Sequence, residues 1–255
     1  STQGVSSAAS DVYKRQDGYY SKGLTGLAES LRQFADVTVV APENNCSGAS
    51  SSLTLKNPLR IRKFEDNSYY VNGTPSDCVF LALTRVLDET PDILISGINH
   101  GANLGDDVLY SGTVGAAMGG RFSGIPCLAA SVTNLKPNYM ETAIEVMSDI
   151  VRDHIKNLKN QAVLNINVPD IPKEDIQGYA ITQLGRRAMP DPSNGNIDAY
   201  GDEIHWIGPP PPAEDNQEDT DFNAIENNLV SITPLTTDLT DKTQIKSLQN
   251  WIADF

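Results

Sequence analysis

The sequence is poor in positive charge and in long apolar runs. Asp and Glu outnumber Lys and Arg 33 to 19, which gives a net charge of −14. Such a surface repels the phosphate backbone of DNA or RNA, so we expect no large nucleic-acid partner. No stretch approaches the roughly 18–20 apolar residues that a membrane span needs, and we expect no signal peptide because the first twenty residues lack an apolar core segment. We therefore expect a soluble, cytoplasmic protein without a membrane partner.

The sequence also has few soft metal ligands. Its three cysteines, Cys46, Cys78 and Cys127, are odd in number and widely spaced. They make neither a disulfide framework nor a zinc site, which suits a reducing compartment. We expect none of them to be catalytic.

Strand and helix patterns alternate from residue 17 onward. Apolar residues recur with the period of a helix over 21–34 and 140–155, and further helices are expected to begin at Thr74 and near Thr113 and to span 243–252. The expected strands span 37–40, 53–56, 59–63, 68–72, 93–95, 125–132, 163–168 and 229–232. This alternation predicts an α/β domain with a mainly parallel sheet.

Two segments depart from this pattern. Residues 185–228 are rich in Pro, Asn and acids, and we expect an irregular extension over the sheet, often a place for lids or subunit contacts. Its Tyr200 and Trp206 could stack on a base, but packing against a neighbouring subunit is the more common role. Residues 1–16 hold two valines and neither Ile nor Leu, so we expect them not to fill the central strand that should precede the helix at 21–34.

Four polar segments follow strands of the predicted sheet. They are Asp17-Gly18, Ala41–Ser50, Ser96–Asp107 and the Tyr110–Val114 turn before a helix. In open α/β sheets, ligands bind beyond the carboxyl ends of the strands, and a helix N-terminus binds phosphate through free N–H groups. Each segment alone reads as a surface loop or a helix cap. Their meeting at one edge of one sheet favours a binding site.

The donors of these segments are oxygens of Asp, Ser and Asn. Oxygen-only ligands predict Mg²⁺ or Mn²⁺ rather than zinc or copper. Such a cation can polarise a phosphoryl oxygen and lower the pKa of a bound water. The residues thus favour a metal-dependent phosphatase.

At these segments the sequence resembles the survival protein SurE family of 5′/3′-nucleotidases, from about residue 17 to the end. The matching segments are Asp17–Tyr19, Val40–Pro42, Ser47–Ser50, Asn72–Val79, Ser96–Asn99, Asn103–Asp107, Tyr110–Thr113, Leu164–Pro169, Thr220–Phe222 and Val230–Leu235. The resemblance implies hydrolysis of nucleoside 5′-monophosphates with one Mg²⁺ or Mn²⁺ per subunit. In some members 3′-nucleotides or short polyphosphate are substrates as well.

The resemblance also implies a domain layout. The whole chain, 1–255, would be one domain: an aberrant segment 1–16, a Rossmann-like core 17–180 in a three-layer sandwich, and an extension 181–255. The extension would end in a segment swapped between the subunits of a homodimer or homotetramer.

Site residues follow from the resemblance position by position. Asp17, Ser47 and Asn99 match metal ligands, and Asp17 and Asn99 are the expected catalytic residues. The residues matched to phosphate binding are Asn103, Ser111, Gly112 and Thr113.

One position of the metal site departs from the family. The family has two adjacent aspartates, and Gln16 stands at the first, where it offers an oxygen but no charge. Losing this carboxylate should lower metal affinity or activity at least as much as the loss of a residue outside the ligand shell, which is roughly 10–100-fold. Residues 5–16 resemble the translation of a transposase adapter used in sequencing libraries, and we hypothesise that they replace a natural strand.

The sequence also bears on two other functions. A dinucleotide-dependent oxidoreductase would need Gly-x-Gly-x-x-Gly after the first strand, which residues 17–23 do not supply. A catalytically impaired nucleotide- or metal-binding homologue stays open because of Gln16. Among the histidines, His100 adjoins Asn99 and could touch substrate or water, whereas His154 and His205 are expected to be structural.

Overall fold

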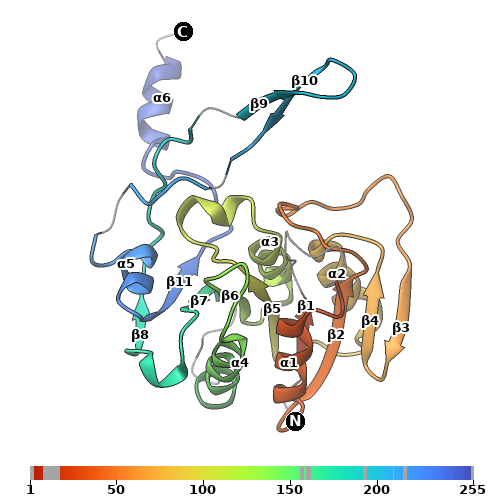
Figure 1. The fold of residues 1–255 in the computed structure, drawn as a ribbon. Helices are drawn as coiled ribbons and strands as arrows, with labels where there is room; N and C mark the ends of the chain where they lie inside the picture. Colours follow the sequence, from red (N-terminus) through yellow and green to blue (C-terminus); the bar gives the residue numbers. More distant parts are fainter. Residues whose placement is uncertain are drawn as a thin grey trace.

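The computed structural model describes residues 3–7, 18–155, 158, 162–191, 194–208, 210–214 and 217–253. Within them runs one sheet of nine strands in the order β3-β4-β2-β1-β5-β6-β7-β11-β8 (Figure 1). β3 pairs antiparallel with β4, and β7 with β11, and all other neighbours are parallel. The predicted α/β class with a mainly parallel sheet is confirmed.

The strands of the main sheet are β1 (Gln3–Ser7), β2 (Asp36–Pro42), β3 (Ile61–Glu65), β4 (Ser68–Val71), β5 (Ile93–His100), β6 (Cys127–Val132), β7 (Val163–Val168), β8 (Tyr179–Ile181) and β11 (Val230–Leu235). A separate hairpin consists of β9 (Asn194–Ile197) and β10 (Glu203–Trp206). The α-helices are α1 (Lys22–Leu31), α2 (Pro75–Leu81), α3 (Gly112–Gly119), α4 (Met140–Asp149), α5 (Asp221–Glu226) and α6 (Ile245–Ala253).

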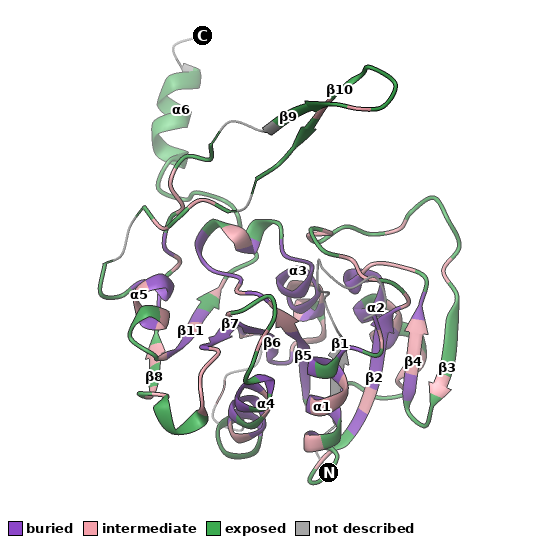
Figure 2. Ribbon diagram, in the orientation of Figure 1, coloured by how far each residue is buried: buried purple, intermediate pink, exposed green. Residues whose placement is uncertain are grey.

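Helices cover both faces of the sheet and produce three layers. Alternate residues of β6 face opposite sides, as the period of a strand requires. Leu128 packs into the core cluster under α1 and α4, whereas Cys127 and Ala129 pack into the cluster under α3. The buried residues in Figure 2 follow these layers. The three-layer arrangement expected for the core is therefore present.

The central strand corrects one expectation. We expected residues 1–16 not to supply it, yet β1 lies between β2 and β5, with Val5 beside Thr38 and Leu94. A parallel ladder needs only backbone N–H and C=O groups, which Gln3–Ser7 provide without Ile or Leu. Residues 8–17 lie outside the described ranges.

A second expectation, a strand over 53–56, is wrong. The Thr54 N–H donates to Asp77 Oδ1 at 2.9 Å, and the Ser52 carbonyl accepts from Thr74 Oγ1 at 2.7 Å. The Thr54 N–H and the Ser52 carbonyl therefore bond to side chains that cap α2 instead of pairing with a neighbouring strand. Thr74 and Asp77 also form a capping box at 3.1 and 2.8 Å, at the helix start predicted at Thr74.

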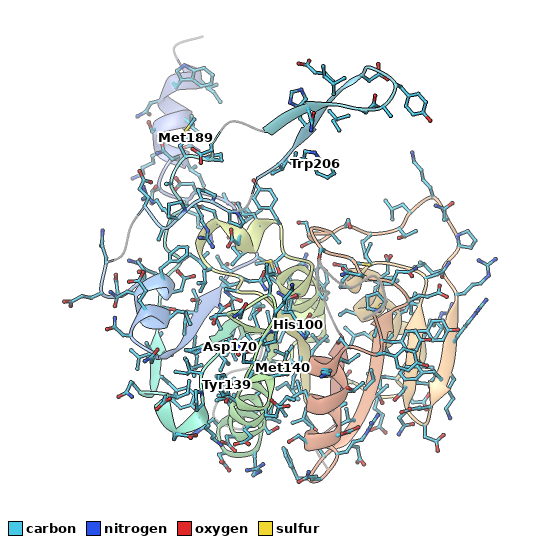
Figure 3. The ribbon with its side chains drawn as sticks, in the orientation of Figure 1. His100, Tyr139, Met140, Asp170, Met189 and Trp206 are labelled. Carbon is cyan, nitrogen blue, oxygen red and sulfur yellow. The ribbon has the colours of Figure 1, made fainter. Side chains whose placement is uncertain are left out.

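A side chain from another segment also fixes the start of α4. The Asp170 carboxylate accepts from the N–H groups of Asn138 and Tyr139 at 3.0 and 2.8 Å, just before α4 begins at Met140. Figure 3 labels Asp170 close to Tyr139 and Met140. A negatively charged side chain at this place interacts favourably with the positive, N-terminal end of the helix dipole.

The extension has two parts. β11 returns to the sheet, with Ile232 beside Ile166 of β7, so the last strand belongs to the core layer although it follows residue 180. The β9–β10 hairpin and α6 instead project away from the sheet (Figures 1 and 2). In the described part of the chain, no helix has the length and apolar character to cross a membrane.

Candidate functional site

A cleft of about 300 Å³ lies where the loop after β2, the end of β5 and the start of α3 come together. The predicted site residues that line it are Ser47, Asn99, Asn103, Ser111, Gly112 and Thr113. Three of the four polar segments therefore meet, although they come from separate parts of the sequence. The predicted Gln16 and Asp17 lie outside the described residues.

Gly18, the residue after Asp17, packs against the end of β2 and the loop that follows it. A Cβ atom on Gly18 would lie only 2.6 Å from the Pro42 carbonyl oxygen and 2.7 Å from that of Glu43. Only glycine allows this approach, because real Cβ contacts do not come so close. The chain therefore enters α1 directly against the loop that carries Ser47.

Asn99 reaches the cleft through an irregularity in β5. The pairing register with β6 shifts between Ser96 and Asn99, and Gly97 has a φ of 139°, which favours glycine. The Asn99 Nδ2 donates to the Gly101 carbonyl at 2.8 Å. This bond orients the amide, so its oxygen is the atom left to act as a cation ligand.

The loop that carries Ser47 lies against α3. A Cβ atom on Gly115 would lie 2.5 Å from the Ser50 carbonyl oxygen, so the glycine lets α3 and this loop touch. Ser50 Oγ donates to the Leu109 carbonyl at 2.7 Å. The Asn45 side chain accepts from both the N–H and the Oγ of Ser47, at 3.0 and 3.3 Å. Local side-chain bonds thus order a loop without regular structure.

The start of α3 provides donors for an anion. Ser111 Oγ accepts from the Val114 N–H at 3.1 Å and caps the helix. Thr113 is 1% exposed, and its Oγ1 has no hydrogen-bond partner among the described residues. A buried hydroxyl without a partner is costly, so its place in the cleft lining indicates a polar ligand there. The positive end of the helix dipole favours an anion.

An ion pair that the sequence did not indicate involves a carboxylate of the cleft lining. Asp107 lines the cleft, and Arg187 donates to both its oxygens, from Nε at 3.2 Å and Nη2 at 2.5 Å. The backbone N–H of Arg187 donates to Asp106 at 2.8 Å, and its Nη1 donates to the Pro211 carbonyl at 2.9 Å. Its guanidinium lies 4.7 Å from the centre of the Phe222 ring. An isolated Arg in an irregular segment has no local signal of this role.

Asp221 is a second anchor that sequence reasoning left without a role. Its carboxylate is fully buried and accepts from the N–H groups of Gly105, Gly185 and Phe222 at 2.8, 2.9 and 3.0 Å. Burial raises the pKa of this carboxyl, although the backbone donors act in the opposite direction. Asp221 thus joins the loop after β5 to the first part of the extension.

Among the cysteines and histidines, Cys46 and His100 line this cleft. Burial raises the pKa of the Cys46 thiol, and the charge of Asp77 raises it further. Burial raises the pKa of Cys127 to about 12 and that of Cys78 well above its usual value. Thiols with raised pKa values are poor nucleophiles near pH 7.

The donor set in the cleft fits a hard cation. Within the described ranges, no group of three or more His, Cys, Asp or Glu could hold a metal. Ser47 and Asn99 instead offer a hydroxyl and an amide oxygen, ligand types that suit Mg²⁺ or Mn²⁺.

Comparisons with known proteins show which proteins this chain is similar to. The family described as "Survival protein SurE" matches residues 15–191. A protein named 5′-nucleotidase SurE from Nitrosomonas eutropha is 48% identical over 242 residues, which cover 94% of this chain and 98% of that protein. One of the same name from Mannheimia succiniciproducens is also 48% identical, with the same coverage. The crystal structure of a SurE protein from Aquifex aeolicus has a TM-score of 0.86 at 37% identity and covers 98% of this chain and 99% of that one.

Proposed function

Because the chain belongs to the survival protein SurE family, we propose that it is a divalent-metal-dependent phosphohydrolase that releases phosphate from nucleoside 5′-monophosphates. The observation that carries this proposal is the cleft itself. It joins hard oxygen donors from Ser47 and Asn99 to the start of α3, where free N–H groups suit a phosphate. Its relatives named 5′-nucleotidase SurE support the substrate class.

The metal half of the site consists of Asp17, Ser47 and Asn99, which would hold Mg²⁺ or Mn²⁺. When bound, the cation supplies a Lewis acid and a water of lowered pKa. The Asn99 amide is already oriented by its bond to Gly101, so it loses little freedom when its oxygen becomes a ligand.

The phosphate half consists of Asn103, Ser111, Gly112 and Thr113. The backbone N–H groups at the start of α3 and the Thr113 hydroxyl donate to phosphate oxygens. Local donors are needed because the whole chain, at −14, repels an anionic substrate. Arg187 reduces the negative potential further, since it pairs with Asp107, a carboxylate of the cleft lining.

The test is phosphate release from AMP and GMP with Mn²⁺ or Mg²⁺, with and without a chelator. We expect release that the chelator abolishes and that added Mn²⁺ restores. Release that is unaffected by the chelator would overturn the metal mechanism. Parallel assays with a 3′-nucleotide and with short polyphosphate define how far the substrate range extends.

A second candidate function follows from Gln16. If the missing carboxylate cannot be replaced, the chain binds metal and nucleotide without turnover. The discriminating variant is Gln16→Asp, measured beside the unchanged chain for AMP binding and for phosphate release. Binding without release that becomes release in Gln16→Asp supports this second function, and release by the unchanged chain excludes it.

We also propose that the chain forms a homodimer or homotetramer through the projecting part of the extension. The exposed apolar side chains of this part include Ile197, Tyr200, Trp206, Ile207, Ile245, Leu248, Trp251 and Ile252. Figure 3 labels Trp206 of β10, and Met189 on the segment that leads to β9, well away from His100 in the body of the protein. Clustered exposed apolar groups are typical of protein contacts.

A further inference from the structure

The segment Leu164–Pro169 matches the family pattern but has no role in the site described above. Its Asn165 and Asn167 lie in β7 and are fully buried, with 0% exposure. Ile166 between them packs into the core cluster under α1 and α4. Because side chains alternate along a strand, both asparagines face the other side of the sheet, where α3 lies.

Both asparagine side chains bind the main chain of Asn103. The Asn103 N–H donates to Asn167 Oδ1 at 2.8 Å. The Asn103 carbonyl accepts from Asn165 Nδ2 at 2.7 Å and from Asn167 Nδ2 at 3.1 Å. The side-chain amide of Asn167 therefore supplies one acceptor and one donor to the main chain of Asn103, as a second peptide group would.

The neighbouring strand holds the side chain of the same residue. Ser131 of β6 is paired in register with Asn167, and its Oγ accepts from Asn103 Nδ2 at 2.7 Å. An asparagine amide has two hydrogens, so this bond leaves one for another acceptor. Asn103 lines the cleft and is 6% exposed. Main chain and side chain are thus both fixed to the sheet.

The choice of residue type argues for function over packing. Burying an amide is unfavourable unless it is hydrogen-bonded, and an apolar side chain of similar volume would stabilise the core better. Moreover, Asn165 Oδ1 has no hydrogen-bond partner in the part of the chain that is described, so its burial adds a further cost. The gain is that the loop between β5 and α3 is fixed at Asn103.

We propose that Asn165 and Asn167 are positioning residues that hold Asn103 so that its side-chain amide donates to the substrate phosphate. The inference rests on the proposed function and deepens it. The asparagines do not touch the phosphate. They act through Asn103, and a displacement of a binding group by about 1 Å can cost roughly 100-fold in rate.

The test compares Asn165→Leu and Asn167→Leu with Thr182→Val. Thr182 is buried and its Oγ1 bonds to Ser231 and Thr233 at 2.8 and 2.7 Å, so its loss removes buried hydrogen bonds of the same sheet but none to Asn103. Binding of inorganic phosphate is measured by calorimetry in the presence of Mn²⁺, with KM and kcat for AMP and the melting temperature. We expect the Kd for phosphate and the KM to rise about 10- to 100-fold in the two leucine variants only.

Each outcome decides a question. If the leucine variants melt as Thr182→Val does and bind phosphate like the wild type, the asparagines are structural and the inference is wrong. A wild type that neither binds phosphate nor releases it from AMP overturns the proposed function as well. If the leucine variants do not fold, Ser131→Ala is measured in the same way. An unchanged Kd in folded Ser131→Ala also contradicts the inference, since a rise of about threefold or more is expected when this bond is lost.

Discussion

The loops around the cleft and the projecting part of the extension differ in where their side chains find partners. Around the cleft, Asn103 and Arg187 bind groups of the same chain at hydrogen-bond distance. In the projecting part, Tyr200 is 92% exposed and Ile252 is 62% exposed. The difference teaches that the cleft can form within one subunit, whereas the extension presents apolar surface that a second copy could cover.

The largest effect that would sharpen this comparison is expected at Asn99. Asn99→Ala removes an oriented oxygen donor from the cleft, so we expect phosphate release from AMP to fall more than about 100-fold. The melting temperature should change little, because the side chain bonds only to Gly101 among the contacts described above. The matched control is Asn134→Ala, whose amide makes a local bond to the Lys136 N–H outside the cleft. Equal losses in both variants would show that the cleft is not the active site.

The next effect is expected where the two regions join. Arg187→Gln leaves Asp107 without its partner beside the phosphate site, so we expect KM for AMP to rise about tenfold, with a smaller rise at high salt. Arg152→Gln is the matched control, since Arg152 also pairs with an acid, Asp149 at 3.2 Å, and lies over an aromatic ring, Phe34. The prediction is wrong if the two variants have the same KM.

A smaller effect on activity, but a clear one on size, is expected from α6. Leu248→Asp combined with Ile252→Asp places charge on its exposed apolar face, so we expect a lower molar mass by light scattering. Phosphate release per subunit should stay within about twofold, as for other surface changes. Leu55→Asp is the control, because Leu55 is 87% exposed but lies outside the extension. If α6 variants keep the mass of the wild type, this face is not an interface.

The smallest effect concerns pH and Asp221. Burial raises the pKa of this carboxyl in the folded protein above its unfolded value of about 4. Its protonated form therefore adds stability that is fully present below about pH 4 and is lost as the pH rises through the folded pKa. Asp221→Asn has no such titration. Urea unfolding of both proteins across this range should show the wild type losing stability relative to the variant, and parallel curves would contradict the raised pKa.

Much of the fold could be predicted from the sequence because apolar periodicity reports burial directly. The strand at 163–168 and the cap at Thr74 are examples. The central strand could not be predicted, because Gln3–Ser7 carry no apolar pattern, and a parallel ladder needs only backbone groups. The prediction of a strand over 53–56 is wrong because side chains that cap α2 bind the backbone at Ser52 and Thr54.

The site was predictable to the extent that it follows strand ends. Ser47, Asn99 and Thr113 meet because parallel strands end at one edge of the sheet. Arg187 and Asp221 were missed as contacts because their partners, Asp107 and Gly105, lie far away in sequence. No local pattern reports such pairs, and the roles of Gln16 and Asp17 stay predictions.

The buried carboxylate of Asp221 has a consequence for biosynthesis. It bonds to Gly105 and Gly185, so the loop on one side of the cleft is tied to a residue made 116 positions later. A nascent chain that has not yet emerged beyond residue 221 lacks this tie, and it lacks β11, which completes the sheet beside β7. Translation therefore delays the finished site until most of the chain has left the ribosome, long after Asn99 and the start of α3 have been synthesised.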